Sequence, residues 1–348
     1  MREKKTLLTQ TQQQIPLQTI MEQTHNDSVE LTVDNIMDNR TDQYVPNTTS
    51  IRHTVLIVYL AGFFFGVAGN ALVIGIISYY KEIRIKSVAN YYIWNLSLAD
   101  LLFILTLPFF SYTTFAKDWP FGEAVCKIAY AFRETNRFSS IFILVALSWD
   151  RFIASFYNLS HLRTIRLGVV TCIVIWLVCL SLSTPYWLLA HTEQTRGNQT
   201  RCVFRWPHQQ TIQYMTIWTY LQLVVGLLLP LLLIITSYVL LTVRLKQMLR
   251  GAASASGVKK PSRKMTKTVA VVVTTFLICQ TPYYLMEVWA LLQQQKAQDH
   301  RQRGMVFIPT PVEIESFIYL NAIAQMLVFI SSSVNPIIYG LLNDNYRK

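Results

Sequence analysis

The feature that most constrains this chain is a series of long apolar segments. From Thr54 to Tyr80 the sequence contains no Asp, Glu, Lys or Arg, and this stretch exceeds the roughly 20 residues that a helix needs to cross a bilayer. A chain with several such segments is expected to be an all-α membrane protein, a bundle of seven transmembrane helices. The six further candidate spans are residues 87–116, 125–156, 167–190, 211–243, 268–292 and 316–342.

The composition excludes most soluble classes of protein. Hydrophobic residues make up 52% of the 348 residues and charged residues only 14%, whereas an ordinary soluble domain carries about 25% charged residues. The net charge of +12 sits on a chain too apolar to be a soluble nucleic-acid binder. Because the sequence also lacks a Gly-rich phosphate loop, a nucleophile elbow and metal-spaced histidines, we expect no enzyme activity, no enzymatic cofactor and no nucleic-acid partner, but contact with membrane lipid.

The positions of the basic residues predict the orientation. They cluster between spans one and two, three and four, and five and six, and the last of these loops contains no acid between Arg244 and Lys267. Since Lys and Arg mark cytoplasmic loops, the N-terminus is expected outside and the C-terminus inside, in the plasma membrane.

The chain divides into three parts on this interpretation. Residues 1–53 form a flexible extracellular tail, residues 54–342 the membrane domain, and residues 343–348 the start of a cytoplasmic tail or amphipathic helix. Asn-x-Ser/Thr motifs in the tail and in the loop between spans four and five predict glycosylation. These sites are Asn26, Asn39, Asn47 and Asn198.

Polar residues inside membrane spans are costly and are therefore functional candidates. The candidates in this chain are, in order, Asn70, Asp100, Asp150-Arg151, Trp176, Pro230, Tyr238, Phe276 to Pro282, and Asn335-Pro336 with Tyr339. This ordered set resembles that of rhodopsin-like, class A G-protein-coupled receptors, over about residues 54–348. A retinal protein would need a Schiff-base lysine, which residues 316–342 lack, and a transporter would show inverted repeats, of which the sequence has none.

Four segments resemble the peptide-receptor branch that holds somatostatin, allatostatin-C, opioid and chemokine receptors: residues 98–108, 119–122, 264–273 and 335–347. The second extracellular cysteine pair that chemokine receptors usually carry is absent, which favours the somatostatin and allatostatin-C side. The resemblance implies an extracellular peptide ligand and a heterotrimeric G protein of the inhibitory class. A chemokine-type receptor, or a virally captured or scavenging receptor with constitutive or no G-protein signalling, remains the alternative.

The family pattern pairs Cys126, at the start of span three, with Cys202 in the loop before span five. The segment 200–206 around Cys202 is expected to form either a short hairpin over the pocket or a plain loop.

The resemblance also assigns activation and G-protein coupling. Asp150 is expected to hold Arg151 in the closed receptor and to release it on opening, while Leu159 inserts into the G protein. Gln280 stands where relatives carry a tryptophan switch, which bears on constitutive activity. The full set is Asp150, Arg151, Leu159, Tyr238, Phe276, Gln280, Pro282, Asn335, Pro336 and Tyr339.

Asp100 is a carboxylate inside span two, where it requires a counter-charge or a proton. The resemblance implies an allosteric sodium ion held by Asp100, Asn136, Ser140, Ser331 and Asn335. A protonated, hydrogen-bonded Asp100 is the alternative, and no other metal is expected.

The predicted ligand pocket departs from its relatives. Where somatostatin and opioid receptors carry an Asp in helix three this chain has Arg133, and Arg137 follows on the same helical face. Arginine suits bidentate recognition of carboxylate or sulfate, so the pocket is expected to favour an anionic ligand group. The alternative is neutralisation within the receptor by Glu134 and Glu287. The candidate ligand-binding residues are Arg133, Arg137, Glu287 and Gln325.

Overall fold

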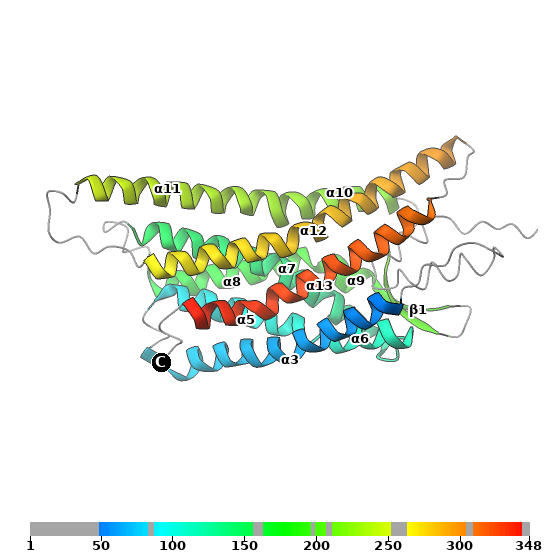
Figure 1. Cartoon of the computed structure of the whole chain (residues 1–348), viewed down its shortest axis with the longest axis horizontal. Coiled ribbons are helices and arrows are strands. Elements are labelled where there is room, and N and C mark those ends of the chain that lie inside the picture. The colour runs from blue at the N-terminus through cyan, green and yellow to red at the C-terminus, as the bar shows by residue number, and fades with distance from the viewer. Residues whose placement is uncertain are drawn as a thin grey trace, which may run out of the picture.

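A computed structural model describes residues 49–82, 87–155, 163–195, 199–206, 211–251, 263–303 and 309–342. Its long helices run roughly parallel to one another along the longest axis of the molecule, and a two-stranded sheet covers one end (Figure 1). The seven predicted spans are all helical. Some helices continue into polar sequence beyond the predicted ends, and the sixth span, for example, runs over residues 263–302 instead of 268–292.

The first four spans correspond to α3 (Thr49–Tyr79), α5 (Val88–Ile104) with α6 (Leu107–Ala116), α7 (Gly122–Ile153), and α8 (Ile165–Leu182) with α9 (Thr184–Leu189). After the hairpin of β1 (Ala190–Gln194) and β2 (Thr200–Phe204), the fifth span comprises α10 (Thr211–Leu223), the π-helical η3 (Val224–Leu228) and α11 (Leu229–Gly251). The last two spans are α12 (Arg263–Gln302) and α13 (Pro311–Leu342).

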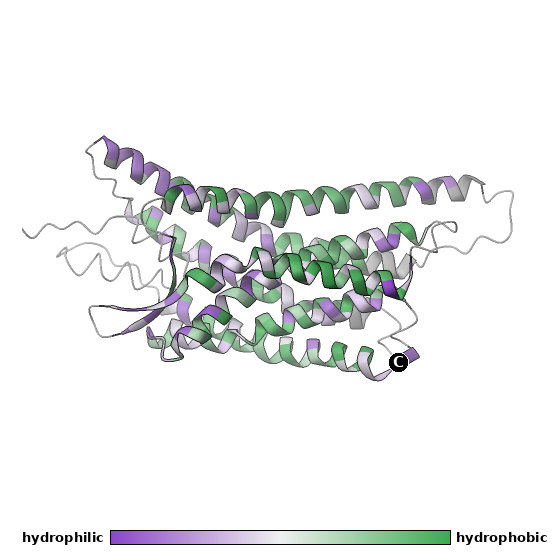
Figure 2. Ribbon diagram, turned by 180° about the vertical axis from the view of Figure 1, so that it is seen from behind, coloured by the Kyte–Doolittle hydropathy of each residue, from purple (hydrophilic) through white to green (hydrophobic). Residues whose placement is uncertain are grey.

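Apolar surface on the outside of the bundle supports the membrane assignment. Six of the helical stretches in the described residues are long and apolar enough to cross a membrane, and Figure 2 shows hydrophobic residues along the middle of the helices, with hydrophilic residues gathered toward their ends. On α8, for example, the side chains of Val170, Ile173 and Leu177 are exposed, as expected for a face turned to lipid.

The seventh long helix, α7, owes its lower hydropathy to the charged residues along its length. It packs against α5, α8, α9, α11 and α12, and against the hairpin. A helix enclosed by other helices meets protein instead of lipid, so its polar side chains can find partners inside the bundle. The predicted functional residues of span three therefore lie at the centre of the molecule.

Two of the spans are interrupted just before a proline. Helical structure breaks at Leu105 and Thr106, before Pro108, and again at Ser183, before Pro185. Proline has no N–H to donate, and its ring clashes with the carbonyl four residues earlier. At the first break the Phe103 carbonyl accepts hydrogen bonds from the backbone N–H of Thr106 at 2.9 Å and from the Thr106 hydroxyl at 2.6 Å.

The π-helical turn η3 brings the fifth span against α12. The hydroxyl of Tyr284 on α12 donates to the carbonyl oxygen of Gly226 at 3.1 Å. A Cβ atom at residue 226 would lie 2.5 Å from that hydroxyl oxygen. Only glycine permits this close approach of α12 to the backbone of the fifth span.

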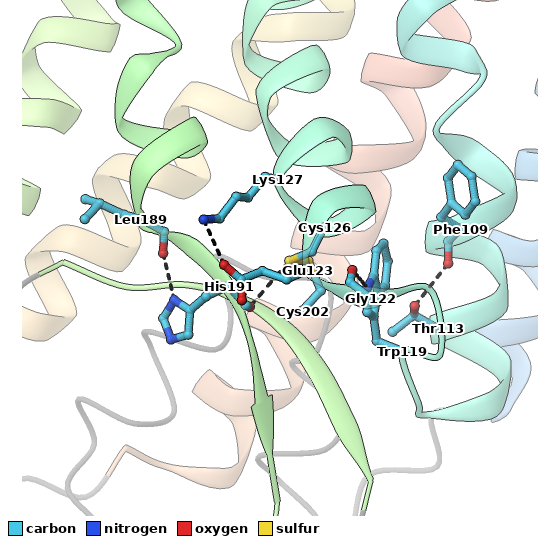
Figure 3. The surroundings of a disulfide bond; sticks show 10 residues. All are labelled: Phe109, Thr113, Trp119, Gly122, Glu123, Cys126, Lys127, Leu189, His191 and Cys202. Carbon is cyan, nitrogen blue, oxygen red and sulfur yellow. Dashed lines mark hydrogen bonds and ion pairs between the residues drawn. A yellow bond between two sulfur atoms is a disulfide. The ribbon is translucent and has the colours of Figure 1, made fainter.

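The hairpin and a disulfide close one end of the bundle. Cys126 in the second turn of α7 is bonded to Cys202 in β2, with the two Cα atoms 5.6 Å apart, and Figure 3 shows the bond joining α7 to the hairpin. The predicted disulfide is confirmed, and of the two alternatives for residues 200–206 the structure has the hairpin, with β1 pairing antiparallel to β2 so that Thr192 lies opposite Cys202. We call this the disulfide end, and the opposite one the Arg151 end.

The turn between α6 and α7 is bonded to the hairpin as well. The backbone N–H of Trp119 donates to the carbonyl of Thr200 at 2.8 Å, and the N–H of Thr200 donates to the Asp118 carboxylate at 2.7 Å. The disulfide from α7 and these two hydrogen bonds from the preceding turn all attach to β2. The hairpin therefore has a defined position over the bundle. The four predicted glycosylation sites lie outside the described residues.

Candidate functional site

Polar residues of α7 form three clusters at successive depths in the bundle. Arg133, Glu134 and Arg137 lie toward the disulfide end, Asn136 and Ser140 in the middle, and Asp150 with Arg151 at the other end; all are buried. One helix therefore connects the three predicted sites.

In the first cluster a carboxylate lies between the two arginines. Glu134 is fully buried, and its Oε2 accepts a hydrogen bond from Nη1 of Arg137 at 2.8 Å. Nε of Arg133 lies 3.8 Å from Oε1 of the same carboxylate, too far for a hydrogen bond but within ion-pair range. Glu134 thus supplies the counter-charge to Arg137, as the internal alternative predicted.

Although the two arginines share a helical face, their guanidinium groups diverge. The Arg133 Cζ lies 4.5 Å from the centroid of the Tyr130 ring and 5.6 Å from that of Phe110, on the α6 side. The Arg137 Cζ lies 3.8 Å from the ring centroid of Tyr283 on α12. Desolvated guanidinium groups gain from such aromatic faces, so the two arginines contact different sides of the bundle, α6 and α12.

The carboxylate of Glu134 also binds the fifth span. The Gln222 side-chain amide of α10 donates to Oε2 of Glu134 at 3.0 Å and lies 3.4 Å from the Tyr186 hydroxyl of α9. The indole N–H of Trp218 donates to the same hydroxyl at 3.1 Å. Gln222 and Tyr186 were not predicted as site residues, because pairing between helices distant in sequence depends on helix rotation.

The remaining predicted pocket residues come from α12 and α13. Gln325 is buried on α13, and Glu287 is partly buried on α12, one turn from Tyr283 on the same helical face. Gln280 is buried at 1% exposure, and its Oε1 has no hydrogen-bond partner among the described residues. Whether these side chains contact a ligand remains a prediction.

The middle cluster centres on Asp100 of α5. Its Oδ1 accepts from the side-chain amide of Asn136 at 3.0 Å and its Oδ2 from that of Asn335 at 2.8 Å. The Asn136 amide also lies 3.3 Å from the Ser140 hydroxyl. Ser331 is buried on α13 one turn before Asn335, so the predicted residues come from three helices that meet at this carboxylate.

The chemistry of this cluster fits a hard cation. Asp100 is fully buried, and no cationic side chain of the described residues forms an ion pair with it. The hydroxyl of Ser97, one turn earlier on α5, is buried without a hydrogen-bond partner in the described part of the chain. Oxygen atoms around an unbalanced carboxylate are the ligands that an alkali cation prefers.

At the Arg151 end, Asp150 is shared between two arginines. Its Oδ2 pairs with the Arg151 guanidinium, as predicted. In addition, Nε of Arg163 donates to Oδ1 at 2.9 Å and Nη2 of Arg163 donates to Oδ2 at 3.3 Å. Arg163 precedes α8 and is one of the basic residues between spans three and four, whose pattern predicts only the orientation, so the sequence did not predict this second partner.

Two further predicted activation residues come together inside the bundle. Phe276 is buried in an apolar cluster that also holds Ile141 of α7, and Tyr238 packs against this cluster. Pro282 lies inside α12 and Pro336 inside α13. The side chain of Tyr339 and the whole of Leu159 lie outside the described residues, so their predicted roles are untested.

Comparison with known proteins adds independent findings. Residues 69–339 match the family described as 7 transmembrane receptor (rhodopsin family). The chain is 28% identical to somatostatin receptor type 2 of Mus musculus over 89% of its length and 79% of the relative's. It is 33% identical to galanin receptor type 1 of Rattus norvegicus (84% and 80%) and 32% identical to C-C chemokine receptor type 1 of Macaca fascicularis (84% and 76%). These similar identities do not single out one receptor type.

Proposed function

Because the chain belongs to the rhodopsin family of seven-transmembrane receptors, we propose that it binds a peptide at the disulfide end of its bundle and activates an inhibitory-class heterotrimeric G protein at the Arg151 end. The observation that carries the proposal is the course of α7. This one helix holds the Arg133–Glu134–Arg137 cluster beneath the hairpin and the Asp150–Arg151 pair at its other end. The relatives named for somatostatin and galanin support a peptide ligand.

The orientation proposed here follows from chemistry at the two ends. A disulfide forms in an oxidising compartment, which supports an extracellular position for the hairpin. The basic residues at the opposite end, among them Arg163 and Arg166, then lie in the cytoplasm. This arrangement presents the pocket to an extracellular ligand and Arg151 to a cytoplasmic partner.

We also propose that the ligand brings an anionic group to Arg133. Glu134 forms a direct hydrogen bond with Arg137, whereas Nε of Arg133 lies 3.8 Å from Oε1 of Glu134. Of the two arginines, Arg133 is therefore the one with the weaker hold on this carboxylate. Arg133→Gln should reach the cell surface and reduce peptide affinity, and amidating or neutralising the acidic groups of an active peptide should cause a loss that is not additive with the substitution.

An allosteric sodium ion is the third part of the proposal. Asp100, with the oxygen atoms of Asn136, Ser140, Ser331 and Asn335, would hold the ion and so favour the closed receptor. Asp100→Asn should abolish the difference in agonist affinity between sodium buffer and buffer of a large organic cation. Equal agonist affinity of the unmodified receptor in both buffers would contradict this part of the proposal.

The direct experiment is a screen of peptide pools, including somatostatin and galanin, on cells that express the chain. Nucleotide exchange on co-expressed G proteins should rise with an active pool and fall on treatment with pertussis toxin. Arg151→Ala, matched for surface expression, should remove the response while the active peptide still binds. A peptide that binds tightly without any nucleotide exchange would instead support the scavenging alternative.

A further inference from the structure

The contact between Arg137 and Tyr283 joins α7 to α12 in the interior of the bundle. The guanidinium carbon of Arg137 lies 3.8 Å from the centroid of the Tyr283 ring. Both side chains are 1% exposed. A guanidinium placed over an aromatic face and shielded from water makes an attractive contact that bulk solvent does not weaken.

Glu134 fixes the position of the Arg137 guanidinium in this contact. The carboxylate accepts from Arg137 at 2.8 Å and from Gln222 of α10 at 3.0 Å. Because it is itself fully buried, removing it would leave Arg137 without its direct counter-charge, which is unfavourable. The four side chains therefore form a connected unit across α7, α10 and α12.

The unit contacts α12 next to Pro282, a point at which the helix can bend. Pro282, directly before Tyr283, lies inside the helix and cannot donate a hydrogen bond to the carbonyl of Ile278. Helices bend where this bond is missing. About fourteen residues separate Tyr283 from Val269 near the Arg151 end, or roughly 20 Å at 1.5 Å per residue. A small change of the bend at Pro282 therefore displaces the Arg151 end of α12 much further than it displaces the residues next to the proline.

We propose that Glu134 and Arg137 are positioning residues that hold α12 in its closed position through Tyr283, and that ligand contact with this unit releases α12. The inference rests on the proposed function, and it names the contact through which the pocket acts on the Arg151 end. A ligand group that draws Arg137 or Glu134 away from its partner weakens the hold on Tyr283. Occupancy of the pocket is thereby converted into movement of α12.

Tyr283→Leu tests the unit, with Tyr283→Phe as the matched control. Leucine removes the ring face under Arg137, whereas phenylalanine keeps the ring and loses only the hydroxyl. The purified full-length receptor would carry one spin label at residue 166 on α8 and one at residue 267 on α12, and the distance distribution between them would be measured without ligand. We expect the longer, open distance to gain roughly tenfold in population relative to the closed one in Tyr283→Leu and to stay unchanged in Tyr283→Phe.

Glu134→Gln is a second substitution that tests the same unit. It should raise the open population as Tyr283→Leu does, and the double variant should open no further than the stronger single variant, since both break one unit. Equal distance distributions for Tyr283→Leu and Tyr283→Phe, or fully additive effects of the two substitutions, would overturn the inference. A role in folding alone would lower thermal stability without changing the distances.

G-protein activation, measured on the same variants, separates this inference from the proposed function. One outcome is that the distances lengthen in the variants while neither they nor the unmodified receptor with a bound peptide promote nucleotide exchange. That result would support the inference about α12 and contradict the proposed activation of a G protein. If peptides promote nucleotide exchange while the distances in Tyr283→Leu match those of the unmodified receptor, G-protein activation is supported and the inference about α12 is wrong.

Discussion

Arg163→Gln is expected to make the receptor harder to activate, although Arg163 lies outside the predicted activation residues. In the structure Arg163 makes two hydrogen bonds to the Asp150 carboxylate, which also holds Arg151. When Arg151 leaves Asp150 to meet the G protein, Arg163 remains as the counter-charge. Without Arg163, the departure of Arg151 would strand a buried carboxylate.

The size of the effect follows from the burial of these groups. The Asp150 side chain is 4% exposed and that of Arg163 is 28% exposed. Stranding a fully buried partner of an ion pair costs about 3–5 kcal/mol, and the partial exposure of Arg163 reduces this to about 1.5–3 kcal/mol because the site can admit water. Each 1.4 kcal/mol is a factor of ten, so the ratio of open to closed receptor should fall by roughly 10- to 100-fold.

Nucleotide exchange on purified G protein, in the absence and presence of an active peptide, measures this ratio. Arg166→Gln is the matched control, since Arg166 is exposed on α8 only three residues away and should leave exchange unchanged. In an Asp150→Asn background the effect of Arg163→Gln should vanish, because the asparagine needs no counter-charge. Higher exchange in Arg163→Gln, or an equal fall in the Asp150→Asn background, would refute the reasoning.

Three further substitutions test other parts of the structure. Arg151→Ala should abolish nucleotide exchange while peptide binding, measured on the same membranes, persists. Cys202→Ser opens a loop of 76 residues and should destabilise the receptor by up to about 4 kcal/mol, seen as lost surface expression, whereas Cys179→Ser should be tolerated; equal losses would contradict the pairing. Gly226→Ala places a Cβ atom 2.5 Å from the Tyr284 hydroxyl and should lower the free energy of unfolding by about 1–3 kcal/mol. The measurement is the melting temperature, and an unchanged value would show that α12 shifts freely.

Much of the architecture could be predicted from local sequence. The length of an apolar segment decides whether a helix can cross a bilayer, because every backbone polar group must be satisfied within the segment, and this predicted seven helices correctly. The family resemblance supplied the pair Cys126–Cys202, and the order of polar residues identified Asp100 and Asp150-Arg151. The interruptions of the spans could also have been anticipated from Pro108 and Pro185, since proline acts on the backbone nearest to it.

The partners of the buried charges were decided by the tertiary structure. Periodicity places Arg133 and Arg137 on one face of α7, but the packing of neighbouring helices sends one guanidinium toward Phe110 and the other toward Tyr283. Likewise nothing in the local sequence distinguishes Arg163, which reaches Asp150, from Arg166, which remains exposed. Apolar length is a property of consecutive residues, whereas an ion pair depends on the rotation and separation of helices that are distant in the chain, and only the folded bundle sets these.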